Sequence, residues 1–183
     1  MLALRLVRLI EGHADELALG LTDKLRQSER TRDFCKVSPE GLCLAAAEIY
    51  HNLGEWLLQK TEIDIAERFK VLGARRATEG VGLHQFVWAL VISRNHLWQF
   101  LQREAFADNI VQLSGKLELQ QMLNQFYDRA VYYGVLGYME TKDEDGEASG
   151  LGAGTGAVRE VAVPVHASGR KHRQRVVSAN CPA

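Results

Sequence analysis

The sequence predicts an all-α fold, a bundle of five to six helices followed by a disordered tail. Through most of residues 2–139, apolar residues recur at three- and four-residue steps, which is the period of an α-helix. No segment of this region shows the alternating pattern of a half-buried strand, and none repeats. Beyond residue 142 the composition becomes charged and then glycine-rich. These observations favour one helical domain over residues 1–141 and a Gly-rich, basic, disordered tail over residues 142–183.

The segment 83–103, LHQFVWALVISRNHLWQFLQR, is predicted to be the central helix of the bundle. Phe86, Leu90 and Leu97 fall on one helical face, whereas Trp88 and Trp98 fall on neighbouring sides. A helix that is apolar on more than one side must be covered on more than one side. The large apolar side chains then form the predicted core: Trp56, Phe69, Phe86, Trp88, Leu90, Leu97, Trp98 and Phe126.

Two helices are predicted in the first 60 residues of the chain. The first covers about residues 2–28, with a leucine-rich face, and ends at the charged link ERTRD. The second starts at Ser38 as N-cap and Pro39 as first helical residue, where a missing N–H costs nothing. Its apolar residues continue to about residue 60.

Two further helices flank the central one. Thr61 is placed to cap a third helix, with Asp64 near its positive end, and Gly80 is a natural stop. After a short link, a last helix is predicted over residues 116–139. Leucine faces at both ends of the domain motivate the expectation that the chain forms a homodimer.

Composition and charge narrow the class of protein. The chain has 183 residues, 46% of them hydrophobic, and a net charge of −1, which argues against nucleic-acid binding by the body of the chain. The basic run at 169–175, GRKHRQR, is interpreted as a solubilising tail. Arg5, Arg8 and Glu11 interrupt the apolar N-terminus, and no stretch is long enough to span a membrane. A cytoplasmic protein is expected.

Candidate chemistry is sparse, and the sequence does not predict an enzyme. There is no phosphate-binding loop after a strand and no serine in a nucleophile elbow. His84 and His96 are the possible haem ligands, but twelve residues separate them, so they point roughly 120° apart on one helix. Cys43, His51 and Glu55 share one helical face and are a weak metal candidate. Ordinary surface or core histidines are the favoured interpretation, with no cofactor expected and haem as the alternative.

Arg75 and Arg76 form the most suggestive charged pair. At the end of the third helix they complement its negative end and can pair with Glu79 or Glu67. The alternative is that one arginine enters the bundle to hold an anion or to fix a helix contact.

The run LGARRATEGVGLHQFVWALVISRNHLWQFL resembles the N-terminal sensory domain of RsbR-type stressosome co-antagonists, the RsbRD N-terminal family of bacteria. The likeness extends loosely over residues 2–140 and is carried by Arg75, Arg76, Glu79, Gly80, Val81, Leu83, Trp88, Arg94, Leu97 and Trp98. It implies a globin-like, non-enzymatic domain that works without haem, forms dimers and signals through STAS-domain regulatory proteins in a stress response. The expected ligand or signal pocket comprises Arg75, Arg76, His84, Trp88 and Trp98.

The chain departs from the family in one respect, because nothing after residue 140 resembles a STAS domain, a helix-turn-helix or a kinase. We therefore expect the output partner to be a separate polypeptide, or a native continuation to have been lost. Two rival functions remain. One is a haem- or metal-binding globin-type sensor that uses His84 or His96, and the other is a structural protein–protein adaptor without a small ligand.

Overall fold

The computed structural model describes residues 2–104 and 110–150, with backbone alone for residues 2, 110–114 and 146–150. Within these ranges every regular element is helical and no strand occurs, so the predicted all-α class is confirmed. The elements are α1 (Leu2–Gly12), α2 (Ala14–Gln27), the 3-10 helix η1 (Glu29–Lys36), α3 (Pro39–His51), α4 (Leu53–Leu58), α5 (Glu62–Thr78), α6 (Leu83–Glu104) and α7 (Ile110–Gly150).

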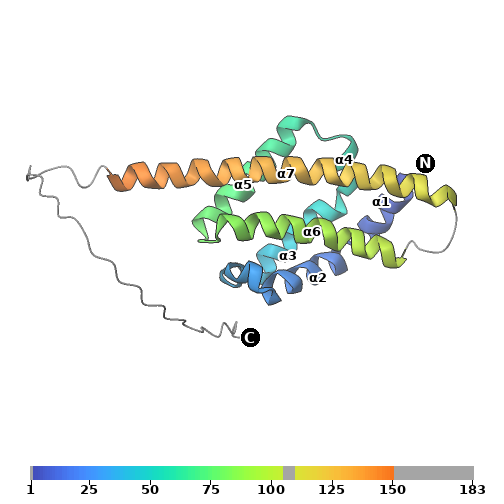
Figure 1. The fold of residues 1–183 in the computed structure, drawn as a ribbon, viewed down its shortest axis with the longest axis horizontal. Helices are drawn as coiled ribbons and strands as arrows, with labels where there is room; N and C mark the ends of the chain where they lie inside the picture. Colours follow the sequence, from blue (N-terminus) through green and yellow to red (C-terminus); the bar gives the residue numbers. More distant parts are fainter. Residues whose placement is uncertain (1, 105–109, 151–183) are drawn as a thin grey trace, which may run out of the picture.

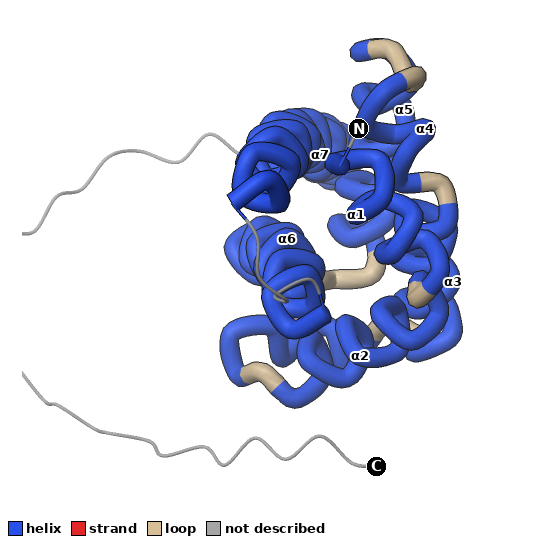
Figure 2. The backbone as a smooth tube through the Cα atoms, turned by 90° about the vertical axis from the view of Figure 1, so that its right-hand side faces the viewer, coloured by secondary structure: helices blue, strands red, loops and turns tan. Residues whose placement is uncertain are grey.

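The helix α6 is central, as predicted. It lies between α2 and η1 on one side and α7 on the other (Figure 1). Viewed from the end of the molecule, α6 and α7 run next to each other, and the remaining helices curve around one side of this pair (Figure 2). The helix α5 packs closely along α7.

Two of the predicted helices are each broken into two. The first breaks at His13, with φ −117° and ψ 19°, and the second at Asn52, with φ −112° and ψ 24°. At each break the side chain donates a hydrogen bond to the carbonyl four residues earlier, from His13 Nδ1 to Leu9 O and from Asn52 Nδ2 to Glu48 O. This local bond competes with the helical backbone bond and stabilises the bend. The expected irregular link ERTRD is likewise replaced by η1.

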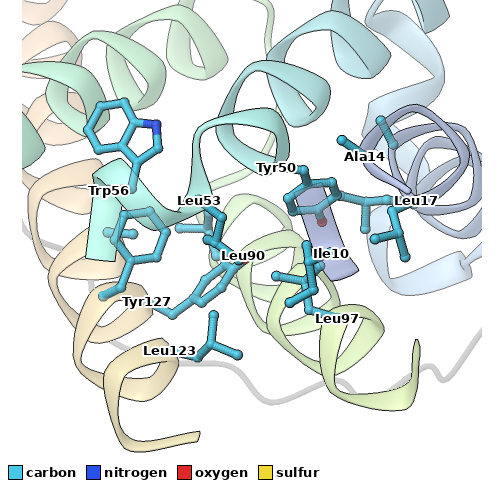
Figure 3. Packing of buried hydrophobic residues seen from close by; sticks show 14 of the residues in the cluster. Ile10, Ala14, Leu17, Tyr50, Leu53, Trp56, Leu90, Leu97, Leu123 and Tyr127 are labelled. Atoms are coloured by element: carbon cyan, nitrogen blue, oxygen red, sulfur yellow. The ribbon is translucent and has the colours of Figure 1, made fainter. Parts of the chain in front are cut away.

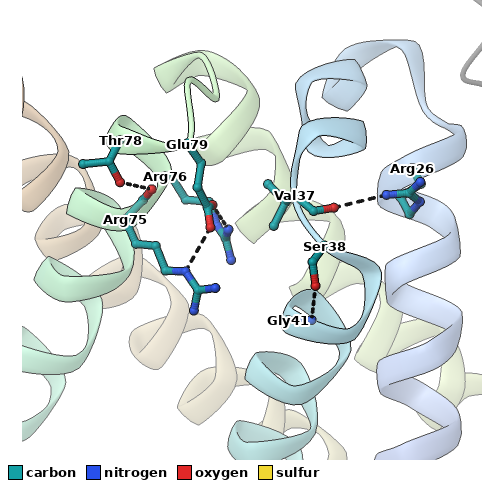
Figure 4. Close-up of polar contacts among 8 residues, drawn as sticks. All are labelled: Arg26, Val37, Ser38, Gly41, Arg75, Arg76, Thr78 and Glu79. Atoms are coloured by element: carbon teal, nitrogen blue, oxygen red, sulfur yellow. Dashed lines mark hydrogen bonds and ion pairs between the residues drawn. The ribbon is translucent and has the colours of Figure 1, made fainter.

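The predicted starts and stops around α3 and α5 are confirmed. Ser38 Oγ accepts a hydrogen bond from Gly41 N, as drawn in Figure 4. Thr61 and Asp64 form a reciprocal capping box at the start of α5. At its end Gly80 has φ 71°, and Val81 N donates to Arg76 O at 3.0 Å, which is the pattern of a Schellman motif.

The last helix is longer than predicted. It begins at Ile110 rather than at residue 116, and it continues past the expected domain boundary at residue 141 as far as Gly150. The remainder of the predicted tail, including the basic run at 169–175, lies outside the described residues.

One apolar core runs through the bundle (Figure 3). Six of the eight predicted core residues are buried: Trp56, Phe69, Phe86, Leu90, Leu97 and Phe126. Trp88 and Trp98 are only half-buried: Trp98 packs against the core from its edge, whereas Trp88 is not part of it. The interior face of α6 is occupied by Phe86, Ala89, Leu90 and Leu97, which leaves the two indoles at the borders of that face.

Glycines allow α5 and α7 to approach closely. A methyl group on Gly73 of α5 would collide with the carbonyl oxygen of Gly134, and one on Gly137 of α7 would collide with that of Lys70. The backbones of the two helices therefore touch where these glycines meet. This contact fixes α7 against the body of the molecule over the segment that borders the site described next.

Candidate functional site: a core cavity with a hydroxyl cluster

A cavity of about 80 Å³ lies in the core of the bundle. Side chains from α2, η1, α3, α5, α6 and α7 line it, and most of its wall is aromatic or aliphatic, including Phe69, Phe86, Leu90 and Phe126. The polar groups at its wall come from four residues, namely Tyr50, Arg76, Ser93 and Tyr127. Helices far apart in the sequence thus converge on one small apolar space with a few polar groups, which is the usual composition of a ligand site.

Three hydroxyl groups form a cluster that joins three helices. Tyr50 of α3 and Tyr127 of α7 both hydrogen-bond Ser93 of α6, with oxygen–oxygen distances of 2.9 and 2.7 Å. Tyr50 and Tyr127 also hydrogen-bond each other. The three hydroxyls therefore bond one another, and an acceptor in the cavity would take a proton from one of these bonds.

Both tyrosines of the cluster stay neutral over the physiological range. Burial raises the pKa of Tyr127 to about 12, although hydrogen bonds from Ser93 and Tyr50 partly oppose the shift. Burial also raises the pKa of Tyr50 well above its ordinary value. The cluster therefore acts as a hydrogen-bonding group and carries no charge.

Arg76 brings a positive charge to the cavity wall. Its side chain is almost fully buried, pairs with Glu79 and lies over the ring of Phe34 at 5.7 Å. Burial lowers the pKa of Arg76, while the Glu79 carboxylate opposes that shift. Glu79 also pairs with Arg75 at 2.9 Å (Figure 4). One carboxylate thus serves two guanidinium groups, and this corner of the site carries an excess of positive charge.

A surface groove between α3 and α5 adjoins the cavity. Ala45 and Leu72 line both spaces, and Arg75 lies in the groove while Arg76 lies at the cavity. The two neighbouring arginines, which the sequence could not tell apart, therefore have different positions. Arg75 is exposed in the groove, and Arg76 points into the bundle.

The other three predicted pocket residues lie elsewhere. His84 is exposed at the start of α6. Trp88 is covered by the guanidinium of Arg30, 4.9 Å from the ring centre. Trp98 lines a separate polar surface pocket with Arg94 and Asn124. Of the five residues proposed from the sequence, only Arg76 lines the cavity, and Arg75 lies in the adjoining groove.

The geometry of His96 does not fit an axial haem ligand. His96 is buried but away from the cavity, and both of its ring nitrogens have partners. Its Nε2–H donates to the Leu17 carbonyl at 3.0 Å, and its Nδ1 accepts from the Lys24 ammonium at 2.9 Å. Burial, followed by the charge of Lys24, lowers the pKa of His96. This histidine is a core hydrogen-bonding residue that ties α6 to α2.

The weak metal candidate also finds no support. His51 Nε2 pairs with Asp15 of α2 at 2.8 Å rather than with Cys43 or Glu55. Among the residues that the structure describes, no group of three or more His, Cys, Asp or Glu side chains gathers as metal ligands would. Among the described residues, no helix is both long enough and apolar enough to cross a bilayer.

Sequence reasoning missed the hydroxyl cluster entirely. Tyr50, Ser93 and Tyr127 are each ordinary residues of their helices and are separated by 43 and 34 positions. The one available signal was a serine on the inner side of an otherwise apolar segment, where a buried hydroxyl needs a partner.

Comparisons with protein-family models, with curated proteins and with solved structures return no match.

Proposed function

We propose that this chain is a non-enzymatic, cytoplasmic sensor domain of bacterial signal transduction. In this proposal it is globin-like in fold but works without haem, forms dimers and relays a signal to an output partner such as a STAS-type regulatory protein. The resemblance to stressosome co-antagonists motivates the assignment, and the all-helical fold is compatible with it. The observation that carries the proposal is the core cavity, with its hydroxyl cluster shared by α3, α6 and α7.

The dimensions of the cavity define the class of ligand. Sites for drug-sized molecules enclose about 300–1,000 Å³, whereas this cavity encloses about 80 Å³. An apolar cavity of about 150 Å³ in an engineered protein takes up benzene or xenon. The proposed ligand is accordingly a small, largely apolar molecule of a few heavy atoms. One acceptor atom on it would receive a hydrogen bond from a hydroxyl of the cluster.

The relay follows from the elements that the cluster connects. A ligand that accepts a hydrogen bond from the cluster competes with the bonds between Ser93 and the two tyrosines. Because Tyr127 belongs to α7, a change in these bonds alters the packing of α7 on α6. Packed helices tend to switch between discrete arrangements. The helix α7 would carry that switch toward its C-terminal end.

Two probes of the same shape test the proposal. Acetone and isobutene have the same heavy-atom skeleton, but only acetone carries an acceptor. In ¹H–¹⁵N NMR titrations we expect both to perturb amides around the cavity, and acetone to perturb the amides near Ser93 and Tyr127 more strongly. Ala89 lines the cavity, so Ala89→Leu should fill it and remove both responses.

Ala66→Leu supplies the matched control, since Ala66 lies on α5 outside the cavity lining. Retention of the acetone response in Ala66→Leu together with its loss in Ala89→Leu supports a ligand site in the core. A structural adaptor without a small ligand predicts no cavity-centred response in any of these proteins. Equal responses in wild type and Ala89→Leu would rule out the cavity as the site.

A further inference from the structure

The outer face of α7 carries a short apolar seam that is largely exposed among the described residues. Tyr132, Val135 and Met139 follow one another at steps of three and four residues. Tyr132 is 64% exposed and Met139 is 50% exposed, whereas Val135 is half-buried. None of the three belongs to the hydrophobic core or packs against it. Spacing of this kind is what one helix presents to another.

The seam faces away from the body of the molecule. The inner face of α7 is occupied by Phe126, Tyr127 and Ala130 in the core, and by Gly137 against α5. Tyr138 also points inward, and its hydroxyl donates to the Val81 carbonyl at 2.8 Å. By the helical period of about 100° per residue, Tyr132 and Met139 lie roughly 120–180° from Phe126 and Ala130. Val135 lies about 60–80° from Tyr127 and Tyr138, which agrees with its half-buried side chain. The seam is therefore open to another molecule.

The charges at the two ends of the seam favour one orientation of a partner helix. Continuing the same steps of three and four residues gives Asp128 before the seam and Lys142 after it, each seven residues from Val135. Two copies that pair in parallel place Asp128 opposite Asp128 and Lys142 opposite Lys142. Two copies that pair antiparallel about Val135 place Asp128 opposite Lys142 twice. Like charges opposed across a helix pair repel, so the antiparallel arrangement is favoured.

Both end residues can take a new partner. Asp128 is 74% exposed and lies 3.6 Å from Arg94, and Lys142 lies 3.4 Å from Asp145 at the surface. Exposed ion pairs of this length contribute about 0–1 kcal/mol. Their rearrangement does not oppose the association of two copies.

We infer that a second copy of this chain docks on the seam, with the two α7 helices antiparallel and Val135 at the two-fold axis. This inference rests on the proposed dimeric sensor and specifies its interface. It also brings the cavity and the interface together, because Tyr127 of the hydroxyl cluster directly precedes Asp128. A shift of Tyr127 on ligand binding would reposition the seam.

The size of the seam sets the strength of the dimer. From Asp128 to Lys142 it spans about 20 Å of helix, at about 1.5 Å per residue. Stable interfaces bury about 800 Å² on each partner, and a single stripe of this length provides less. The dimer is therefore expected to dissociate on dilution through the micromolar range.

Charge exchange tests the orientation as well as the face. Sedimentation equilibrium of the full chain over a series of concentrations should show the mass rising from the monomer value of 20.5 kDa toward twice that value. Asp128→Lys alone and Lys142→Asp alone should each weaken association about ten-fold, because each places like charges opposite one another. An equimolar mixture of the two variants should associate at least as well as the wild type, and so should the double variant. A parallel pair predicts instead that each single variant associates about as well as the wild type, because like charges already face one another in a parallel wild-type pair. The single variants therefore decide the orientation, since the mixture is repaired in either arrangement.

Val135→Asp should abolish the dimer, because it places two carboxylates at the two-fold axis. Leu44→Asp is the control, since Leu44 on α3 is 71% exposed on a different element and should leave the mass unchanged. Far-ultraviolet circular dichroism of every variant verifies that the helices are retained. A dimer that is insensitive to all seam variants overturns the inference but leaves a dimeric sensor possible through another face. A monomer at all concentrations overturns both the seam and the dimer, while the acetone titration still tests ligand sensing independently.

Discussion

The buried Arg76 guanidinium depends on a single carboxylate, that of Glu79. Removing that carboxylate leaves a buried charge without its partner, which is much more costly than losing an exposed pair. We predict that Glu79→Gln lowers the free energy of unfolding by about 3 kcal/mol, measured by urea denaturation. Glu48→Gln, which breaks the more exposed pair with Arg68, should cost about 1 kcal/mol or less. Equal losses in the two variants would contradict the interior role of Arg76.

His96 gives the fold a defined acid sensitivity. Its pKa in the folded protein lies below the ordinary value of 6.5, first because of burial and then because of Lys24. The unfolded chain therefore binds a proton that the folded chain resists. The contribution of His96 to the free energy of unfolding is therefore fully present above about pH 6.5 and is lost as the pH falls below that value.

Replacing His96 by glutamine should flatten that acid limb. Glutamine can still donate to the Leu17 carbonyl but does not titrate. The slope of unfolding free energy against pH below 6.5 should decrease by up to about 1.4 kcal/mol per pH unit, measured by chemical denaturation at a series of pH values. His84→Gln, at an exposed position of the same helix, controls for the loss of an imidazole. An unchanged slope in His96→Gln would show that this residue does not carry the effect.

At the residue scale, the sequence predicted local features well and interior polar partners poorly. The caps at Ser38 and Thr61 and the stop at Gly80 depend only on neighbours in the chain, and all three are confirmed. Which of Arg75 and Arg76 turns inward depends on the packing of η1 and α6 around the end of α5. That information is not contained in the helical period.

The helices α5 and α7 lie backbone to backbone where Gly73 meets Gly134. Because backbone lies against backbone there, Gly73→Ala should force the two helices apart and lower the free energy of unfolding by about 3 kcal/mol. Gly12 is the matched control, since an added methyl group there meets nothing within 4 Å, and Gly12→Ala should be neutral or slightly stabilising. Thermal or urea unfolding measures both. Equal stability of the two variants would mean that α5 and α7 are not in backbone contact.

Helical period identified α5 and α6 almost to the residue but did not find the breaks at His13 and Asn52. The apolar stripe continues across both breaks, since the helices that follow them bury residues in the same core. The bends instead depend on single side chain–backbone hydrogen bonds. The extension of α7 was missed for the opposite reason. Its last residues, DEDGEASG, include two glycines and lack an apolar stripe, so the pattern gave no sign of a helix there.

For the molecule as a whole, the fold class and the central place of α6 followed from the sequence, but the cavity did not. A packed core leaves such a space only where side chains from several elements fail to fill it, and six elements contribute here. The two tryptophans, which dominated the apolar content of α6, turned out to border the core. The interior site was instead built from tyrosines, a serine and an arginine.

The central claim is that a small molecule in the core cavity changes the packing of α7. Amide hydrogen exchange along residues 128–145, with and without acetone, tests this most directly. We predict that acetone changes protection in this segment of the wild-type protein and has no effect on Ala89→Leu. Identical exchange with and without acetone in the wild type, under conditions where NMR shows the cavity to be occupied, would contradict the account.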